Sequence, residues 1–191
     1  FTPEWRKAAG KQYIDVGIAE EHAIAMNSGI AKNGGKPVFN VYSTFLQRAY
    51  DQLVQDLCVN NNSAVIMNHQ ASVYGMNDVT HLGFFDIPML TSIPNLVYLA
   101  PTNNEELLAM TKYAVHQQDH PVAIRVPVGE FVSSGVVDTT DYSILHKSQV
   151  TRSGEGIAKE FHDRYDATEL LKENGVSLEQ IVADAKQILS V

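Results

Sequence analysis

The chain has 191 residues, a formal net charge of −8 and one cysteine. This length allows one substantial domain with a buried core and a smaller appendage. The acidic balance, without a cluster of Lys or Arg, disfavours nucleic acids and anionic membranes as partners. No apolar run approaches the ~20 residues that span a bilayer, and the start of the chain lacks a secretory pattern, so we expect a cytoplasmic protein. Cys58 has no disulfide partner and is expected in the core.

Short β-capable segments alternate with helical ones over the first two thirds of the chain. Strands are expected at 12–16, 37–42, 63–68, 96–100 and 121–126. Helices are expected over 20–32, from Ser43 to Asn60 and from Asn103 onward, because apolar residues recur there at helical spacing. This alternation predicts an α/β fold with a doubly wound, mainly parallel sheet and helices on both faces.

The remaining segments are less regular. The stretch over 69–88 is longer than most connections inside compact domains, and such loops are functional or disordered. After Pro127 the composition shifts to Ser, Thr, Gly and Asp, which indicates a domain boundary near 128–135. Capping-box patterns at Asp166 and Ser177 each predict a short helix. We therefore expect a domain over 1–130, a linker with the start of a truncated domain over 131–158, and short helices over 159–191.

The stretch Tyr13-Ile-Asp-Val-Gly-Ile-Ala-Glu20 has the pattern of a buried strand, a glycine turn and a helix start. In an open α/β sheet, ligands bind beyond the carboxyl ends of the strands, and Glu20 falls at such an end. An acid in the first turn of a helix is also explained by the helix dipole alone. Glu20 is therefore a candidate catalytic acid with a purely structural alternative.

Two further polar stretches follow the second and third predicted strands. They supply an aromatic ring in Phe45, a cation in Arg48 and an imidazole in His81, which could share one crevice with Glu20. Each has a plain alternative: a core ring, a surface ion pair and a hydrogen-bonded loop residue. P-loop, dinucleotide-binding and nucleophile-elbow motifs are absent from the sequence, and the histidines lack a metal-ligand spacing.

Two runs of residues resemble the thiamine-diphosphate-dependent transketolase superfamily. Asp15-Val-Gly-Ile-Ala-Glu-Glu-His-Ala23 is similar to its catalytic-glutamate motif. The more diagnostic run is Tyr42-Ser-Thr-Phe-Leu-Gln-Arg-Ala-Tyr-Asp-Gln52, which is similar to members that condense pyruvate with glyceraldehyde 3-phosphate. The resemblance covers residues 13–127 and implies a pyrimidine-binding domain, a transferase of aldehyde or ketone groups, and a homodimer.

The resemblance also implies roles for single residues. Glu20 would hydrogen-bond N1′ of the aminopyrimidine ring and, as a protonated acid, promote the tautomer that generates the thiazolium ylid. Phe45 would stack on that ring, with Ile18 and Tyr42 beside it. The groups facing the substrates would be Arg48, Asn77 and His81, of which His81 would also be catalytic.

The chain departs from the family pattern where two arginines would hold the acceptor phosphate, because Gln70 and Val128 stand at those positions. Bidentate arginine–phosphate contacts are strong, so their loss brings the acceptor into question. Arg48 or Arg125 could replace them. Two hypotheses therefore stay open beside the phosphorylated acceptor: a transketolase-like carboligase with a different, unphosphorylated acceptor, and a non-catalytic interaction module.

Two parts of the family architecture have no counterpart in this sequence. One is the amino-terminal domain that binds the diphosphate through Mg²⁺, so the chain alone is expected to be inactive and to hold thiamine diphosphate weakly. The other is the middle of the third domain, because 149–158 is similar to its opening and 159–191 to its end. We expect a junction near Ala158 and, since the chain opens on Phe1, a processed or excised fragment.

Overall fold

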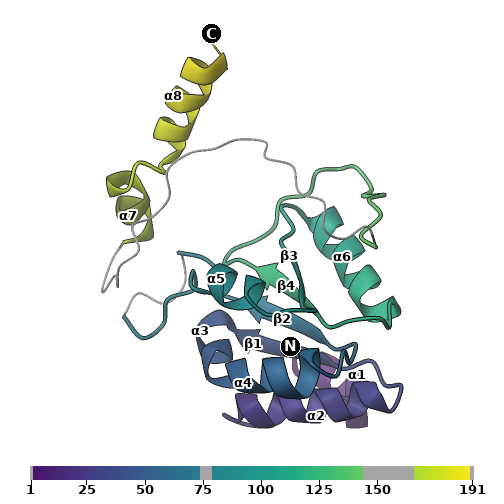
Figure 1. Ribbon diagram of the computed structural model, residues 1–191. Helices are drawn as coiled ribbons and strands as arrows, with labels where there is room; N and C mark the ends of the chain where they lie inside the picture. Colours follow the sequence, from purple (N-terminus) through teal and green to yellow (C-terminus); the bar gives the residue numbers. More distant parts are fainter. Residues whose placement is uncertain (1, 74–78, 144–165, 190–191) are drawn as a thin grey trace.

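The computed structural model describes residues 2–73, 79–143 and 166–189. Its strands are all short, and helices separate them along the chain (Figure 1). The strands are β1 (Val38–Tyr42), β2 (Val65–His69), β3 (Val97–Leu99) and β4 (Val122–Val126). The helices are α1 (Pro3–Ala9), η1 (Gly10–Gln12), α2 (Glu20–Lys32), α3 (Ser43–Leu46), η2 (Gln47–Ala49), α4 (Tyr50–Gln52), η3 (Leu53–Cys58), α5 (Asp86–Thr91), α6 (Asn104–His116), α7 (Ala167–Glu173) and α8 (Leu178–Leu189).

The four strands form one parallel sheet in the order β1-β2-β4-β3. The register places Tyr42 beside His69, and His69 beside Val126, so the carboxyl ends of three strands meet at one edge. The prediction of a doubly wound parallel α/β fold is therefore confirmed. Four of the five expected strands are present, each within three residues of its expected bounds.

The expected strand over 12–16 is wrong, because this segment forms no ladder in the described structure. Asp15 Oδ1 instead accepts a hydrogen bond from the Gly17 N–H at 2.9 Å, and Gly17 has a φ of +67°. An aspartate that bonds the backbone two residues on favours a turn over a ladder. Ile14 is 54 % exposed as a result. β1 consequently pairs only with β2 among the described residues.

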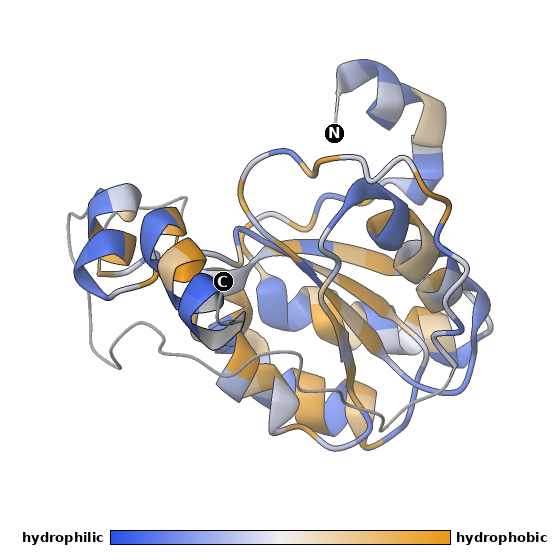
Figure 2. Cartoon of the chain, turned by 90° about the horizontal axis from the view of Figure 1, so that it is seen from above, coloured by the Kyte–Doolittle hydropathy of each residue, from blue (hydrophilic) through white to orange (hydrophobic). Residues whose placement is uncertain are grey.

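The core has one layer on each face of the sheet. On one face, α2, α3, η3 and α5 pack on the apolar side chains of the strands, with Ile24, Leu53 and Ile66 fully buried among them. On the other face, α6 covers β3 and β4 through Met110 and Ala114. Figure 1 shows α2 and α6 on opposite sides of the sheet, and Figure 2 shows the apolar colour concentrated in the strands.

The helical segment expected from Ser43 to Asn60 is present but irregular. It passes through α3, η2 and α4 and ends in η3, a π-helix. Its last turn is tied to α2, because Ser28 Oγ donates to the Asp56 carbonyl oxygen at 2.5 Å and Asn62 Nδ2 donates to Ser28 Oγ at 2.8 Å. These two bonds fix α2, and hence Glu20 at its start, against the segment that follows β1.

The two carboxyl-terminal helices begin where the capping patterns predict. Asp166 Oδ1 accepts from the N–H groups of Thr168 and Glu169, and Ser177 Oγ accepts from that of Gln180. Both helices stand to one side of the sheet (Figures 1 and 2). The three-part division of the chain stays a prediction, and the expected junction at Ala158 lies outside the described residues. None of the described helices has the length and apolar character needed to cross a bilayer.

Candidate active site

Glu20 is the first residue of α2 and is buried, with 9 % of its surface exposed. Its Oε2 atom lies 3.5 Å from Nη1 of Arg48, whose side chain is half exposed. This approach is an ion pair without hydrogen-bond geometry, and Oε2 has no hydrogen-bond partner in the described structure. A buried carboxyl oxygen without a donor or acceptor is costly, so this atom is suited to a ligand group.

Three rings follow one another beside the carboxyl end of β1. The rings of Tyr42 and Phe45 are stacked, with centroids 5.9 Å apart and planes inclined by 15°. The ring of His81 meets Phe45 edge-on at 5.4 Å. A bond from Thr44 Oγ1 to the Thr80 carbonyl oxygen, 2.9 Å long, holds the two segments together. The fold therefore brings the predicted site residues Phe45 and His81 into contact.

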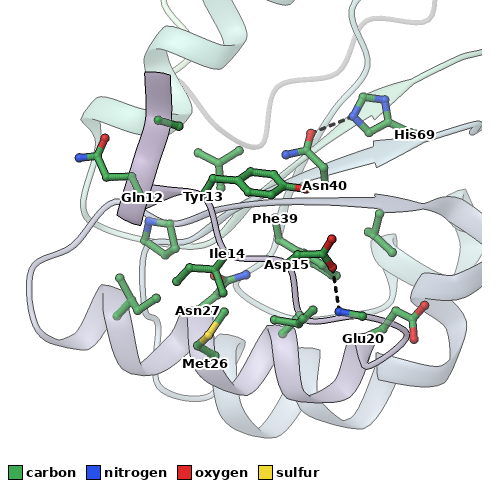
Figure 3. A pocket seen from close by; sticks show the side chains of 18 of the residues that line it. Gln12, Tyr13, Ile14, Asp15, Glu20, Met26, Asn27, Phe39, Asn40 and His69 are labelled. Carbon is green, nitrogen blue, oxygen red and sulfur yellow. Dashed lines mark hydrogen bonds between the residues drawn. The ribbon is translucent and has the colours of Figure 1, made fainter. Parts of the chain in front are cut away.

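A pocket of about 1200 Å³ runs between α2 and the outer edge of β1. Its wall includes Asp15 and Glu20 on one side and Asn40 and His69 on the other (Figure 3). Tyr42 also belongs to this wall. Phe45 also lines it, so Glu20 and the rings of Tyr42 and Phe45 open onto one cavity, whereas His81 is not part of its wall. The sequence predicts Glu20 and Phe45 at the carboxyl ends of neighbouring strands. The strand before Glu20 does not form, and the two residues share a pocket between the start of α2 and the edge of β1.

The pair formed by Asn40 and His69 was not predicted from the sequence. Nε2 of His69 lies 3.0 Å from Oδ1 of Asn40, across neighbouring strands. Burial lowers the pKa of the His69 imidazole, which keeps the ring neutral at pH 7. The one available signal was Asn40 itself, a polar residue in the middle of the apolar segment 37–42.

The remaining predicted residues have different outcomes. Ile18 is 88 % exposed and does not line the pocket, and Asn77 lies outside the described residues. Arg125 is already engaged, because its Nε lies 2.9 Å from Oδ2 of the fully buried Asp86. The structure therefore disfavours Arg125 as a replacement phosphate ligand, and Arg48 keeps that possibility.

Asp86 is the centre of a buried polar cluster that sequence reasoning missed. Asn68 Nδ2 donates to Asp86 Oδ2 at 3.1 Å, and the Tyr98 hydroxyl also donates to it. Burial and the nearby carboxylate raise the pKa of Tyr98. The cluster joins α5 to β2, β3 and β4. Its members are 12 to 39 residues from Asp86 in sequence, so only the fold brings them together.

Comparison with known proteins gives a consistent family. The curated relatives include 1-deoxy-D-xylulose-5-phosphate synthases from Crocosphaera subtropica, 38 % identical over 172 residues, and Clostridium acetobutylicum, 41 % identical over 155 residues. These alignments cover 87 % and 81 % of this chain but 27 % and 25 % of the relatives. The chain thus spans about a quarter of the length of the curated relatives that it matches.

Solved structures agree on the fold. A split-gene transketolase, described as an inactive β4 tetramer, has a TM-score of 0.60 at 22 % identity and covers 72 % of this chain and 45 % of its own. Transketolase from Leishmania mexicana also has a TM-score of 0.60, at 20 % identity, covering 65 % and 19 %. The sequence family described as the transketolase pyrimidine-binding domain matches residues 3–132. The chain belongs to the transketolase pyrimidine-binding domain family.

Proposed function

We propose that this chain is the pyrimidine-binding part of a thiamine-diphosphate-dependent transferase. The reaction would decarboxylate pyruvate and condense the remaining two-carbon unit with an aldehyde, as in 1-deoxy-D-xylulose-5-phosphate synthase, whose acceptor is glyceraldehyde 3-phosphate. The observation that carries the proposal is the buried Glu20 oxygen without a hydrogen-bond partner, facing a pocket whose wall holds stacked aromatic rings. The 36–41 % identical synthases support it.

The described residues fit the aminopyrimidine end of this cofactor. Oε2 of Glu20 can share a hydrogen bond with a ring nitrogen, and Phe45 and Tyr42 offer flat apolar surface to an aromatic ring. Ile18 is proposed as a further neighbour once the rest of the enzyme covers its exposed side chain. When bound, thiamine diphosphate supplies the carbon nucleophile that attacks the carbonyl carbon of pyruvate.

The protein residues would divide the remaining tasks. Glu20 holds and returns a proton at the ring nitrogen, and its burial excludes competing water. Arg48, 3.5 Å from Glu20 and half exposed, is free to turn toward a substrate carboxylate or phosphate. His81 meets Phe45 edge-on from the loop after β2, outside the wall of the described pocket, and is the proposed second catalytic residue. Asn77 remains a proposed substrate ligand by position in the sequence.

The diphosphate and Mg²⁺ would be bound by a domain outside this chain. Among the described residues, no three His, Cys, Asp or Glu side chains are grouped in a way that could hold a metal ion. We expect the complete enzyme to be a cytoplasmic homodimer. The structural neighbour that is a split-gene transketolase forms an inactive tetramer, and by analogy this chain should be inactive without the diphosphate-binding domain.

The test compares Glu20→Ala with Glu21→Ala in the full-length protein. Both acids lie in the first turn of α2, but only Glu20 lines the pocket. Glu20→Ala should lower the rate of pyruvate decarboxylation by ~10²-fold or more, the usual effect of losing a proton-transfer partner, while Glu21→Ala should stay within about twofold of the wild type. Equal rates in the two variants would remove Glu20 from the mechanism.

Calorimetric titration separates the enzyme from an interaction module. The full-length protein should bind thiamine diphosphate saturably in the presence of Mg²⁺, and Glu20→Ala should weaken this binding. A pure interaction module would show no saturable heat, and that outcome would sink the proposed function as a whole.

A further inference from the structure

The hydrogen bond between Asn40 and His69 fixes what each side chain can still do. An amide oxygen only accepts, so His69 Nε2 carries the hydrogen of the 3.0 Å bond and Nδ1 keeps its lone pair. The Asn40 amide keeps two N–H donors. No other described residue contacts Nδ1 of His69 or Nδ2 of Asn40 within hydrogen-bond distance. The pair therefore offers one acceptor and a neighbouring donor.

Both side chains belong to the wall of the pocket that also holds Glu20 (Figure 3). Tyr42 and His69 are register partners, so they lie side by side on the same face of the sheet. Tyr42 in turn stacks on Phe45. The pair thus continues the aromatic wall of the proposed cofactor site toward the middle of β1, and a substrate that extends from the reaction centre along this wall would reach it.

The pair is suited to an uncharged group. A donor beside an acceptor complements a hydroxyl, which both donates and accepts, whereas a phosphate only accepts. The neutral imidazole offers no positive charge. Among the described residues that line the pocket, the carboxyl groups are Asp15 and Glu20, and the Lys or Arg cation is Lys36. Lys36 precedes β1, at the opposite end of the strand from Tyr42, and donates to the Gln117 carbonyl oxygen at 3.0 Å.

We infer that Asn40 and His69 form an acceptor-specificity pair that hydrogen-bonds a hydroxyl group of an uncharged hydroxyaldehyde. The inference rests on the proposed function and names the acceptor class for the same site. The hydroxyl concerned is the one on C3, which is esterified in glyceraldehyde 3-phosphate, so the phosphorylated aldehyde is the poorer acceptor for this protein. The two residues act by binding and orienting the acceptor and take no part in proton transfer at the cofactor.

The kinetic test uses the full-length protein with thiamine diphosphate, Mg²⁺ and pyruvate. D-glyceraldehyde and D-glyceraldehyde 3-phosphate are compared as acceptors, and each condensation rate is divided by the decarboxylation rate of the same preparation. The wild type should give the higher kcat/KM with D-glyceraldehyde. Asn40→Ala should lower this value about five- to tenfold, mainly through KM, as expected for about one lost hydrogen bond. His69→Lys should shift the preference about tenfold or more toward the phosphorylated aldehyde.

The matched control is His120→Gln. His120 is also a partly buried histidine whose Nε2 lies 2.9 Å from a neighbouring side chain, the Tyr113 hydroxyl, but it is not part of the pocket wall. The His120→Gln variant should leave the ratio of kcat/KM for the two acceptors unchanged. A wild-type preference for the phosphorylated aldehyde, or an Asn40→Ala variant with an unaltered acceptor ratio, would overturn the inference.

A binding measurement keeps the inference testable apart from the enzyme function. In ¹⁵N-labelled full-length protein, the Nδ1 resonance of His69 should shift on titration with D-glyceraldehyde and remain in place with inorganic phosphate, with His120 as the internal reference. Loss of decarboxylation together with a retained shift would reject the proposed function and keep the hydroxyl-binding pair. Decarboxylation with no shift would reject the pair and keep the function.

Discussion

Replacing Arg125 with Met should destabilise the protein more than its partly exposed position suggests. Asp86 is 0 % exposed at its side chain, and Arg125 provides its charged partner at 2.9 Å. The variant leaves a carboxylate supported by the neutral donors of Asn68 and Tyr98, while Asp86 Oδ1 is buried without a partner already. Removing one member of a buried ion pair costs about 3–5 kcal/mol, against a total of about 5–15 kcal/mol for a domain.

Urea denaturation of the 191-residue chain, followed by circular dichroism, measures this loss. Arg48→Met is the matched control, because the Arg48–Glu20 pair is longer at 3.5 Å and half exposed, and it should cost under about 1 kcal/mol. Adding Asp86→Asn to Arg125→Met removes the unpaired charge and should restore part of the stability. A loss of less than about 1 kcal/mol in Arg125→Met, or no recovery in the double variant, would refute the reasoning.

Three further outcomes follow from local structure. A Cβ at Gly83 would collide with backbone atoms of Gln70 and Ser72, so Gly83→Ala should lower the thermal midpoint. A Cβ at Gly29, an exposed position of α2, would meet no other atom, so Gly29→Ala should raise the free energy of unfolding by about 1 kcal/mol in denaturation measurements. Burial raises the pKa of Cys58 to about 12, so iodoacetamide at pH 8 should label it only after unfolding, and rapid labelling of the native protein would contradict this. Hydrogen bonds from Ser133 and Ser134 lower the pKa of Glu105 to about 2. The stabilisation from these bonds is complete above the unfolded pKa near 4.3 and is lost as the pH falls through about 2. The Ser134 amide resonance should therefore titrate near pH 2 in NMR, and a midpoint above pH 4 would argue against the contact.

The parts of the fold that sequence predicted well are those set by local periodicity. The helix over 20–32 has its predicted bounds, because its apolar residues keep helical spacing and Gly34 ends it with a φ of +82°. The strand over 12–16 failed because the side chain of Asp15 competes with the ladder for backbone N–H groups. α5 was missed because its six residues are too few for a periodic signal.

The candidate site also contains residues that local sequence predicts and residues that only the fold brings together. Glu20, Phe45 and His81 could be proposed from the sequence because they belong to motifs of a known superfamily, although the strand expected before Glu20 does not form. Asn40 and His69, 29 residues apart, were not, because their contact depends on the register of two parallel strands. That register depends on which faces of the whole sheet are buried, and a short stretch of sequence does not carry this information.

β1 is hydrogen-bonded along one side only among the described residues, and this has a consequence for how the site behaves. A strand with half of its backbone bonds opens at a lower free energy than the doubly paired β2 and β4 beside it. Asn40 and Tyr42 belong to β1, so this part of the binding surface lies on an edge strand, which is less protected than the central strands β2 and β4. A ligand that contacts Asn40 or Tyr42 binds only while β1 is paired with β2. Its observed affinity is therefore reduced by the free energy needed to keep β1 paired.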